Sequence, residues 1–100
     1  MDFNLVVMSG LLAAPPDRSR VAQAGGSRLL LTVRSQEPMP RVDLLPVSLR
    51  LDQLPAGCET GQRIWVAGSL QRRFSATTGR SRIEVIAHHV ERRIEDAPAP

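Results

Sequence analysis

Apolar and polar residues alternate through most of this chain, which is the pattern of half-buried β-strands. The clearest example is segment 63–70, where Ile64, Val66 and Leu70 share one parity. The other parity is largely polar and carries the only tryptophan, Trp65. We therefore expect one face of this strand to pack in a core and the other to face outward.

Gly68 lies inside the same predicted strand. A glycine within a strand often marks a bulge or a bend at the corner of a barrel. It indicates that the strand curves around a small closed sheet. The triplet Arg72-Arg73-Phe74 follows directly, and there a guanidinium can meet phosphate while an aromatic ring meets a base.

Four further strands are predicted, each bounded by turns that contain proline or glycine. They comprise residues 5–12, 28–33, 41–51 and 80–90. Pro46 places its strand at an edge or a bulge, because proline has no N–H to donate. Pro55 and Gly57 limit residues 52–58 to a short helix at most.

The residues between the strands are predicted to be loops, and composition predicts little regular structure at the C-terminal end. Residues 18–24 are expected to form a loop or a ragged strand extension, and residues 75–79 a hairpin-like loop. Residues 91–96 are expected to be a charged, weakly ordered end. We divide the chain into a barrel domain of residues 1–94 and a short disordered Ala/Pro tail of residues 95–100.

The order of these elements predicts an all-β fold. Five strands, with at most a short helix between the third and fourth, are typical of the OB-fold, a five-stranded Greek-key barrel. An SH3-like barrel has the same strand count, so the count alone leaves both open. OB-folds commonly bind oligonucleotides on the second and third strands and on nearby loops.

Composition adds a preference among partners. The chain has 100 residues, enough for one domain with one core. All thirteen basic side chains are arginine and the net charge is +3. Arginine binds phosphate bidentately and stacks on flat rings, which is compatible with a nucleic-acid partner. Only Phe3, Trp65 and Phe74 are aromatic, so the core must be aliphatic.

The cysteine content and the hydropathy of the chain indicate the cellular compartment in which the protein is expected. Cys58 is the only cysteine, so an internal disulfide is impossible and a reducing compartment is expected. The apolar runs are too short to span a bilayer, and residues 1–4 lack the basic start of a signal peptide. We expect a soluble, cytoplasmic, nucleoid-associated protein without membrane contact.

Three segments resemble bacterial single-stranded-DNA-binding (SSB) proteins. Residues 4–18 contain an Asn, an alternating apolar strand, Gly-Leu and a Pro-acidic-Arg turn, similar to the start of that family. Residues 60–74 look like its fourth strand and residues 79–90 like its last. The resemblance covers most of the chain and extends to the tail-less primosomal replication protein N (PriB) branch. It implies an OB-fold, sequence-tolerant binding of single-stranded DNA and a homodimer or homotetramer.

Candidate nucleic-acid-binding residues flank the second and third strands and the last loop. They are Arg28, Arg34, Arg41, Arg50, Arg72, Arg73, Phe74, Arg80 and Arg82. The alternative is that these arginines are simply solvated, that Arg82 pairs with Glu84, and that the Phe74 ring folds over the barrel mouth.

Candidate interface residues are Val6, Met8 and Trp65. The first strand is apolar on both faces, which invites pairing with a second copy. Trp65 either packs against another subunit or stacks on a base.

No catalytic or metal-binding constellation stands out. His88 and His89 are neighbours in a strand, so their side chains point to opposite faces and cannot easily hold one ion. We expect neither enzymatic activity nor a cofactor.

The sequence therefore predicts a single-stranded-DNA-binding protein of replication, repair or recombination, with RNA as a possible ligand. Replication or repair proteins are further expected partners. The alternative is a protein-interaction OB module, a replication-restart accessory or scaffold with weak or no nucleic-acid binding. The absence of aromatic residues between Arg28 and Arg50 favours this alternative, and the arginines favour DNA binding.

Overall fold

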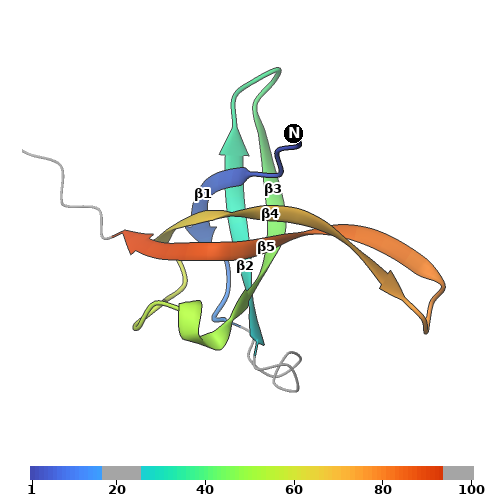
Figure 1. Ribbon diagram of the computed structural model, residues 1–100. Helices are drawn as coiled ribbons and strands as arrows, with labels where there is room; N and C mark the ends of the chain where they lie inside the picture. The colour runs from blue at the N-terminus through green and yellow to red at the C-terminus, as the bar shows by residue number, and fades with distance from the viewer. Residues whose placement is uncertain (17–25, 94–100) are drawn as a thin grey trace, which may run out of the picture.

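The chain forms a closed, five-stranded β-barrel in a computed structural model that describes residues 1–16 and 26–93 (Figure 1). The predicted all-β barrel is confirmed, including the short helical turn between the third and fourth strands. Its elements are β1 (Val6–Leu12), β2 (Gly26–Ser35), β3 (Arg41–Arg50), the 3₁₀ helix η2 (Leu51–Gln53), β4 (Arg63–Ser75) and β5 (Arg80–Arg93).

The strand order around the barrel is β1-β2-β3-β5-β4, and β4 pairs back to β1. All neighbours are antiparallel except β3 and β5, which are parallel and in register at Val47–Val85 and Ser48–Ile86. Pro46 directly precedes this parallel contact and lies opposite Leu30 of β2. At Pro46, β3 is therefore paired with β2 on one side and has no strand of the described chain on the other. A proline is tolerated there because no hydrogen bond from a backbone N–H is needed on the open side.

The core is aliphatic, as the shortage of aromatic residues requires. The inward residues alternate with outward ones along β2, β3 and β4, whereas β5 changes parity between Ala87 and Val90, where its register with β4 shifts. The buried apolar residues are Leu12, Leu29, Leu31, Val47, Leu49, Ile64, Val66, Ala87 and Val90.

Gly68 lies at a β-bulge. The register between β4 and β5 shifts between Ala67 and Gly68. A Cβ atom on Gly68 would lie 2.0 Å from the carbonyl oxygen of Ile86, so no other residue fits without movement of the backbone. The interpretation of this glycine as a bend in a closed sheet is confirmed.

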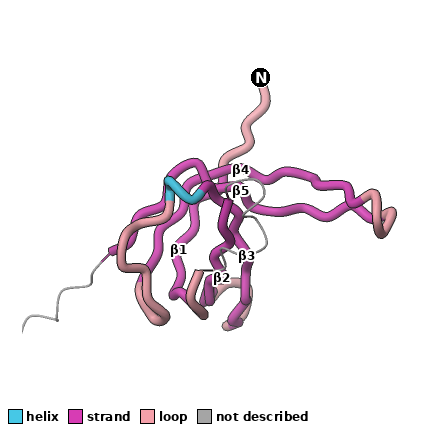
Figure 2. The backbone as a smooth tube through the Cα atoms, turned by 90° about the horizontal axis from the view of Figure 1, so that it is seen from below, coloured by secondary structure: helices cyan, strands magenta, loops and turns pink. Residues whose placement is uncertain are grey.

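Beyond the bulge, β4 and β5 continue as a long two-stranded hairpin that leaves the barrel (Figures 1 and 2). The paired residues run from Leu70–Val85 to Ser75–Arg80. Leu70 was expected in the core, but it is 45% exposed. The expectation is wrong because the strand leaves the barrel at this residue while its alternation continues.

The other end of β5 is also longer than predicted. Residues 91–93, expected to be weakly ordered, pair with the start of β4 through Trp65–Glu91 and Arg63–Arg93. The ladder supplies backbone hydrogen bonds that the local composition does not reveal. The predicted loop at 18–24 and the predicted tail at 95–100 lie outside the described residues.

Candidate nucleic-acid interface

The outward face of β2 and β3 carries three of the candidate arginines. Because Leu29 and Leu31 of β2 point into the core, the residues between them in the alternation point outward. Arg28 and Arg34 are at outward positions of β2, and Arg50 is at the equivalent position at the end of β3. These three residues span the length of the two-stranded face.

The same outward face continues onto the β4–β5 hairpin. Ser48 of β3 lies beside Ile86 of β5, and Glu84 and Arg82 follow on that side at intervals of two residues. Across the hairpin, Arg73 lies opposite Arg82. We call this continuous face the arginine surface; it comprises Arg28, Arg34, Arg50, Arg73, Arg80 and Arg82.

Two candidate arginines lie elsewhere. Arg41 shares the other parity of β3 with Asp43, and its Nη2 lies 2.8 Å from the Asp43 carboxylate. Arg72 lies opposite Ile83 and shares a hairpin face with Phe74. The Arg72-Arg73-Phe74 triplet is therefore divided, with Arg73 on the arginine surface and the other two on the opposite face.

Ion pairing further separates the candidates. Arg41, Arg50 and Arg73 each pair with an acidic side chain: Asp43, Asp52 and Glu84 respectively. Within residues 1–16 and 26–93, the other candidates make no ion pair, so their guanidinium groups are available to an anion. These are Arg28, Arg34, Arg72, Arg80 and Arg82.

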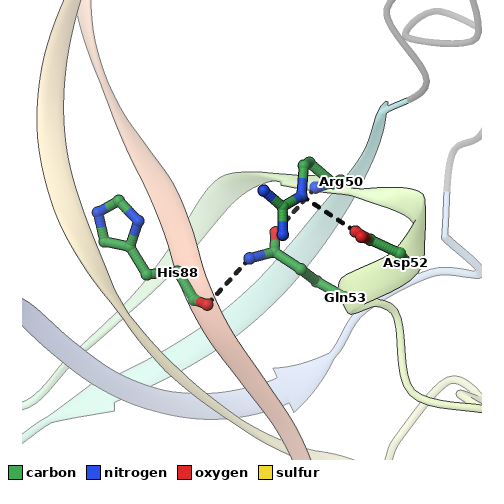
Figure 3. Close-up of polar contacts among 4 residues, drawn as sticks. All are labelled: Arg50, Asp52, Gln53 and His88. Carbon is green, nitrogen blue, oxygen red and sulfur yellow. Dashed lines mark hydrogen bonds and ion pairs between the residues drawn. The ribbon is translucent and has the colours of Figure 1, made fainter.

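Arg50 is held at the junction of β3 and η2 (Figure 3). Its backbone N–H donates to Gln53 Oε1 at 2.9 Å, and Gln53 Nε2 donates to the His88 carbonyl at 2.9 Å. The Arg50 Nε donates to Asp52 Oδ1 at 3.1 Å. These contacts fix η2 to β5 and keep Arg50 at one end of the arginine surface.

Phe74 lies near the tip of the hairpin and is 70% exposed. Its ring is thus open to a base and does not fold over the barrel mouth. A depression of about 420 Å³ lies beside it. The lining combines three guanidinium groups, hydroxyl groups and this ring, and consists of Arg73, Phe74, Ser75, Thr78, Arg80, Ser81 and Arg82.

Glu84 is the site residue that sequence reasoning missed. The sequence offered Glu84 only as an alternative partner of Arg82, but the Glu84 side chain is 7% exposed and pairs with Arg73. Ser48 Oγ also lies 3.5 Å from Glu84 Oε2. Burial of Glu84 depends on β3 lying beside β5, a contact between segments far apart in sequence, so no local pattern could reveal it.

Between the ends of the arginine surface lies an aliphatic area. Leu44 and Val42 of β3 are 58% and 61% exposed, and each lies opposite a residue of β2, Thr32 and Arg34 respectively. Exposed apolar area of this kind often marks a binding surface. The area contains no ring on which a base could stack.

The candidate interface residues divide between two faces. Met8 packs against the core and Val6 is half-buried on the same parity, so the exposed apolar side chain of β1 is that of Val7. Trp65 is half-buried on the outward side of β4, and the Arg93 guanidinium lies 4.6 Å from its ring centroid. This cation–π contact occupies part of the ring that was expected to meet a subunit or a base.

The two histidines lie at the bulge. His88 Nε2 is 3.0 Å from Ser69 Oγ, and His89 lies opposite Ala67. Within the described parts of the chain, no three His, Cys, Asp or Glu side chains come together as metal ligands would. No helix in those parts is long and apolar enough to cross a membrane.

No protein-family model and no curated protein sequence match the chain. Many solved structures match its fold, however. The SSB of Plasmodium falciparum in complex with single-stranded DNA has a TM-score of 0.70 and 15% identity, covering 96% of this chain and 97% of that one. The chain has an OB-fold similar to those of the SSB and PriB structures.

Two further matches support this OB-fold assignment over nearly the whole chain. The dimeric N-terminal domain of PriB from Thermoanaerobacter tencongensis has a TM-score of 0.68 and 19% identity, covering 92% of this chain and 98% of that one. A small single-stranded-DNA-binding protein from Streptomyces coelicolor has a TM-score of 0.68 and 15% identity, covering 94% of this chain and 96% of that one. At these identities the similarity concerns the fold. Because all three structures have the same fold as this chain, the SH3-like barrel is no longer an alternative.

Proposed function

We propose that this protein binds single-stranded DNA with little sequence preference, in replication, repair or recombination. The observation that carries the proposal is the arginine surface, which extends from β2 and β3 onto the β4–β5 hairpin on one side of the sheet. Backbone phosphates follow one another along a single strand, and a row of guanidinium groups complements them. The solved relatives described as single-stranded-DNA-binding proteins support the same function.

The arrangement favours a single strand over a duplex. Phe74 lies on the opposite face of the hairpin from Arg80 and Arg82, but it is exposed and lines the same depression, so a base can stack on the ring while its phosphate meets a guanidinium. In a duplex the base is already stacked and paired, and that contact is lost. Stacking and phosphate contacts do not identify the sugar, so single-stranded RNA is a second expected ligand.

The deciding experiment is a fluorescence-anisotropy titration with labelled oligo-dT and with a duplex of equal length, at two salt concentrations. We expect tighter binding of the single strand and an affinity that falls as salt rises, with a log–log slope of about −0.7 for each phosphate contact. Equal binding of both ligands, or an affinity independent of salt, would contradict the proposal.

We further propose that the protein acts as a homodimer or homotetramer in the cytoplasm, associated with the nucleoid. The exposed Val7 on β1 and the half-buried Trp65 on β4 lie on one outward side of the barrel, where a second copy could pack. The PriB domain with a similar fold is described as dimeric, which supports self-association.

The second candidate function is a protein-interaction module, with replication or repair proteins as partners. The exposed aliphatic residues Val42 and Leu44 on the β2–β3 face favour it, because apolar side chains without rings suit a protein partner better than a base. Failure to bind single strands in the titration above would favour this function.

A further inference from the structure

A carboxylate lies within the arginine surface, and it is almost fully buried. The Glu84 side chain is 7% exposed, whereas that of Arg73, its ion-pair partner, is 61% exposed. Arg73 contacts Glu84 Oε1 through Nε. Within the described residues this oxygen accepts no hydrogen bond of regular geometry, so the guanidinium is its compensating group.

The burial of Glu84 distinguishes this pair from the other pair on the arginine surface. Arg50 and Asp52 are 73% and 72% exposed, so water can replace either partner at little cost. Glu84 has no such access to water. If Arg73 turned away toward a phosphate, it would leave a buried charge without compensation, which is strongly unfavourable. Arg73 is therefore held by Glu84 much more firmly than Arg50 is held by Asp52.

We propose that Glu84 masks Arg73 and thereby lowers the affinity of the arginine surface for nucleic-acid phosphates. The inference rests on the proposed function. The charges of the two groups sum to zero, so a phosphate gains little net attraction at this position. Arg73, a candidate phosphate contact by sequence, then contributes mainly to pairing within the protein, and the arginines without acidic partners carry the binding.

The substitution Glu84→Gln tests this directly, because it removes the charge and keeps the size of the side chain. Unmasking one arginine should make the slope of log affinity for oligo-dT against log salt concentration steeper by about 0.7. The affinity ratio of E84Q to the parent should consequently grow about five-fold for each ten-fold reduction in salt. The double variant Arg73→Gln/Glu84→Gln should return to the parental slope, because the net charge at the pair is again zero.

A matched control removes a different ion-paired glutamate of the same strand. Glu91 lies 3.7 Å from Arg93 and opposite Trp65, outside the arginine surface. Glu91→Gln changes the net charge of the protein by the same amount as E84Q and should leave the slope unchanged. Glu84→Met serves as a second unmasking variant if the buried amide of E84Q prevents folding, which thermal melts would reveal.

The outcomes separate the two proposals. A steeper slope in E84Q or E84M, reversed in the double variant and absent in E91Q, supports masking. If the parent binds single strands with the expected salt dependence and a folded E84Q or E84M has an equal or shallower slope, the masking inference is wrong while the proposed function stands. If only the unmasked variants bind, masking is supported and the function proposed for the parent is wrong. If none of these proteins binds oligo-dT at the lower salt concentration, both proposals are wrong.

Discussion

Asn4 uses its side chain to pair with the backbone of Leu70. Its Nδ2 donates to the Leu70 carbonyl at 2.7 Å, and the Leu70 N–H donates to its Oδ1 at 2.8 Å. The β1–β4 ladder has Val6 opposite Gly68, so the contact between Asn4 and Leu70 continues that register two residues beyond the end of β1. The contact lies where the hairpin leaves the barrel, and it joins the N-terminal segment to the base of the hairpin.

Replacing Asn4 by Ala should lower the free energy of unfolding by about 1–2 kcal/mol, because two hydrogen bonds to the backbone are lost. For a domain of this size the melting temperature should fall by about 4–8 °C for each kcal/mol. Amide hydrogen exchange should be faster at Leu70, whose N–H loses its acceptor. Asp2→Ala, two residues earlier in the same segment, is the control, and an equal effect of both substitutions would contradict the role assigned to Asn4.

Arg82→Gln should flatten the salt dependence of oligo-dT binding by about 0.7 in log–log slope and weaken binding to all sequences alike. Arg82 lies on the arginine surface and makes no ion pair within the described residues. Arg41→Gln is the matched control, because Arg41 is off that surface and already paired with Asp43. Anisotropy titrations at several salt concentrations measure both slopes; identical slopes in R82Q and the parent would exclude Arg82 as a phosphate contact.

Phe74→Ala should weaken single-strand binding by about 1–3 kcal/mol while leaving the salt slope almost unchanged, since a stacking contact is lost and no phosphate contact is. The ring is 70% exposed, so the melting temperature should change little. Ile83→Ala removes an exposed apolar side chain that is not aromatic and should leave binding nearly intact. A large loss of thermal stability in F74A, with normal affinity of the folded protein, would instead indicate a structural ring.

Val7→Glu should shift the protein toward the monomer. Val7 is exposed on the outward side of β1, and a carboxylate there would be buried without a partner in a subunit contact. Light scattering on the parent should give the mass of at least a dimer at tens of micromolar, as an order of magnitude. Met39→Glu, at an equally exposed apolar residue in the loop between β2 and β3, is the control. A monomeric parent would contradict the proposed self-association.

In β4, alternation in the sequence predicted two of the residues that enter the barrel, but it did not reveal where the strand leaves it. Ile64 and Val66 are buried as predicted, whereas Leu70 continues the same parity and is exposed. A period of two describes the orientation of a side chain relative to its own strand. Whether the inward side faces a core depends on the other strands, which end before the hairpin does.

The parts of the interface that were missed depend on contacts between distant segments. Glu84 lies on the outward parity of β5 and is nevertheless buried, in contact with Ser48, 36 positions earlier, and with Arg73 across the hairpin. The split of Arg72 and Arg73 between faces is, by contrast, a local property that alternation already contains. Gly68 was interpretable because one glycine within an apolar strand has few physical explanations, and the close approach of Ile86 is one of them.

The parallel contact between β3 and β5 consists of only two residue pairs, Val47–Val85 and Ser48–Ile86, and the arginine surface crosses it. A bound strand that touches Arg28 on one side and Arg82 on the other would act as a non-covalent cross-link over this junction. By linkage, a ligand at 100 times its Kd adds about 2.7 kcal/mol to the free energy of unfolding. Occupancy by nucleic acid and closure of the barrel would then be thermodynamically coupled, and the melting temperature would rise with oligo-dT concentration.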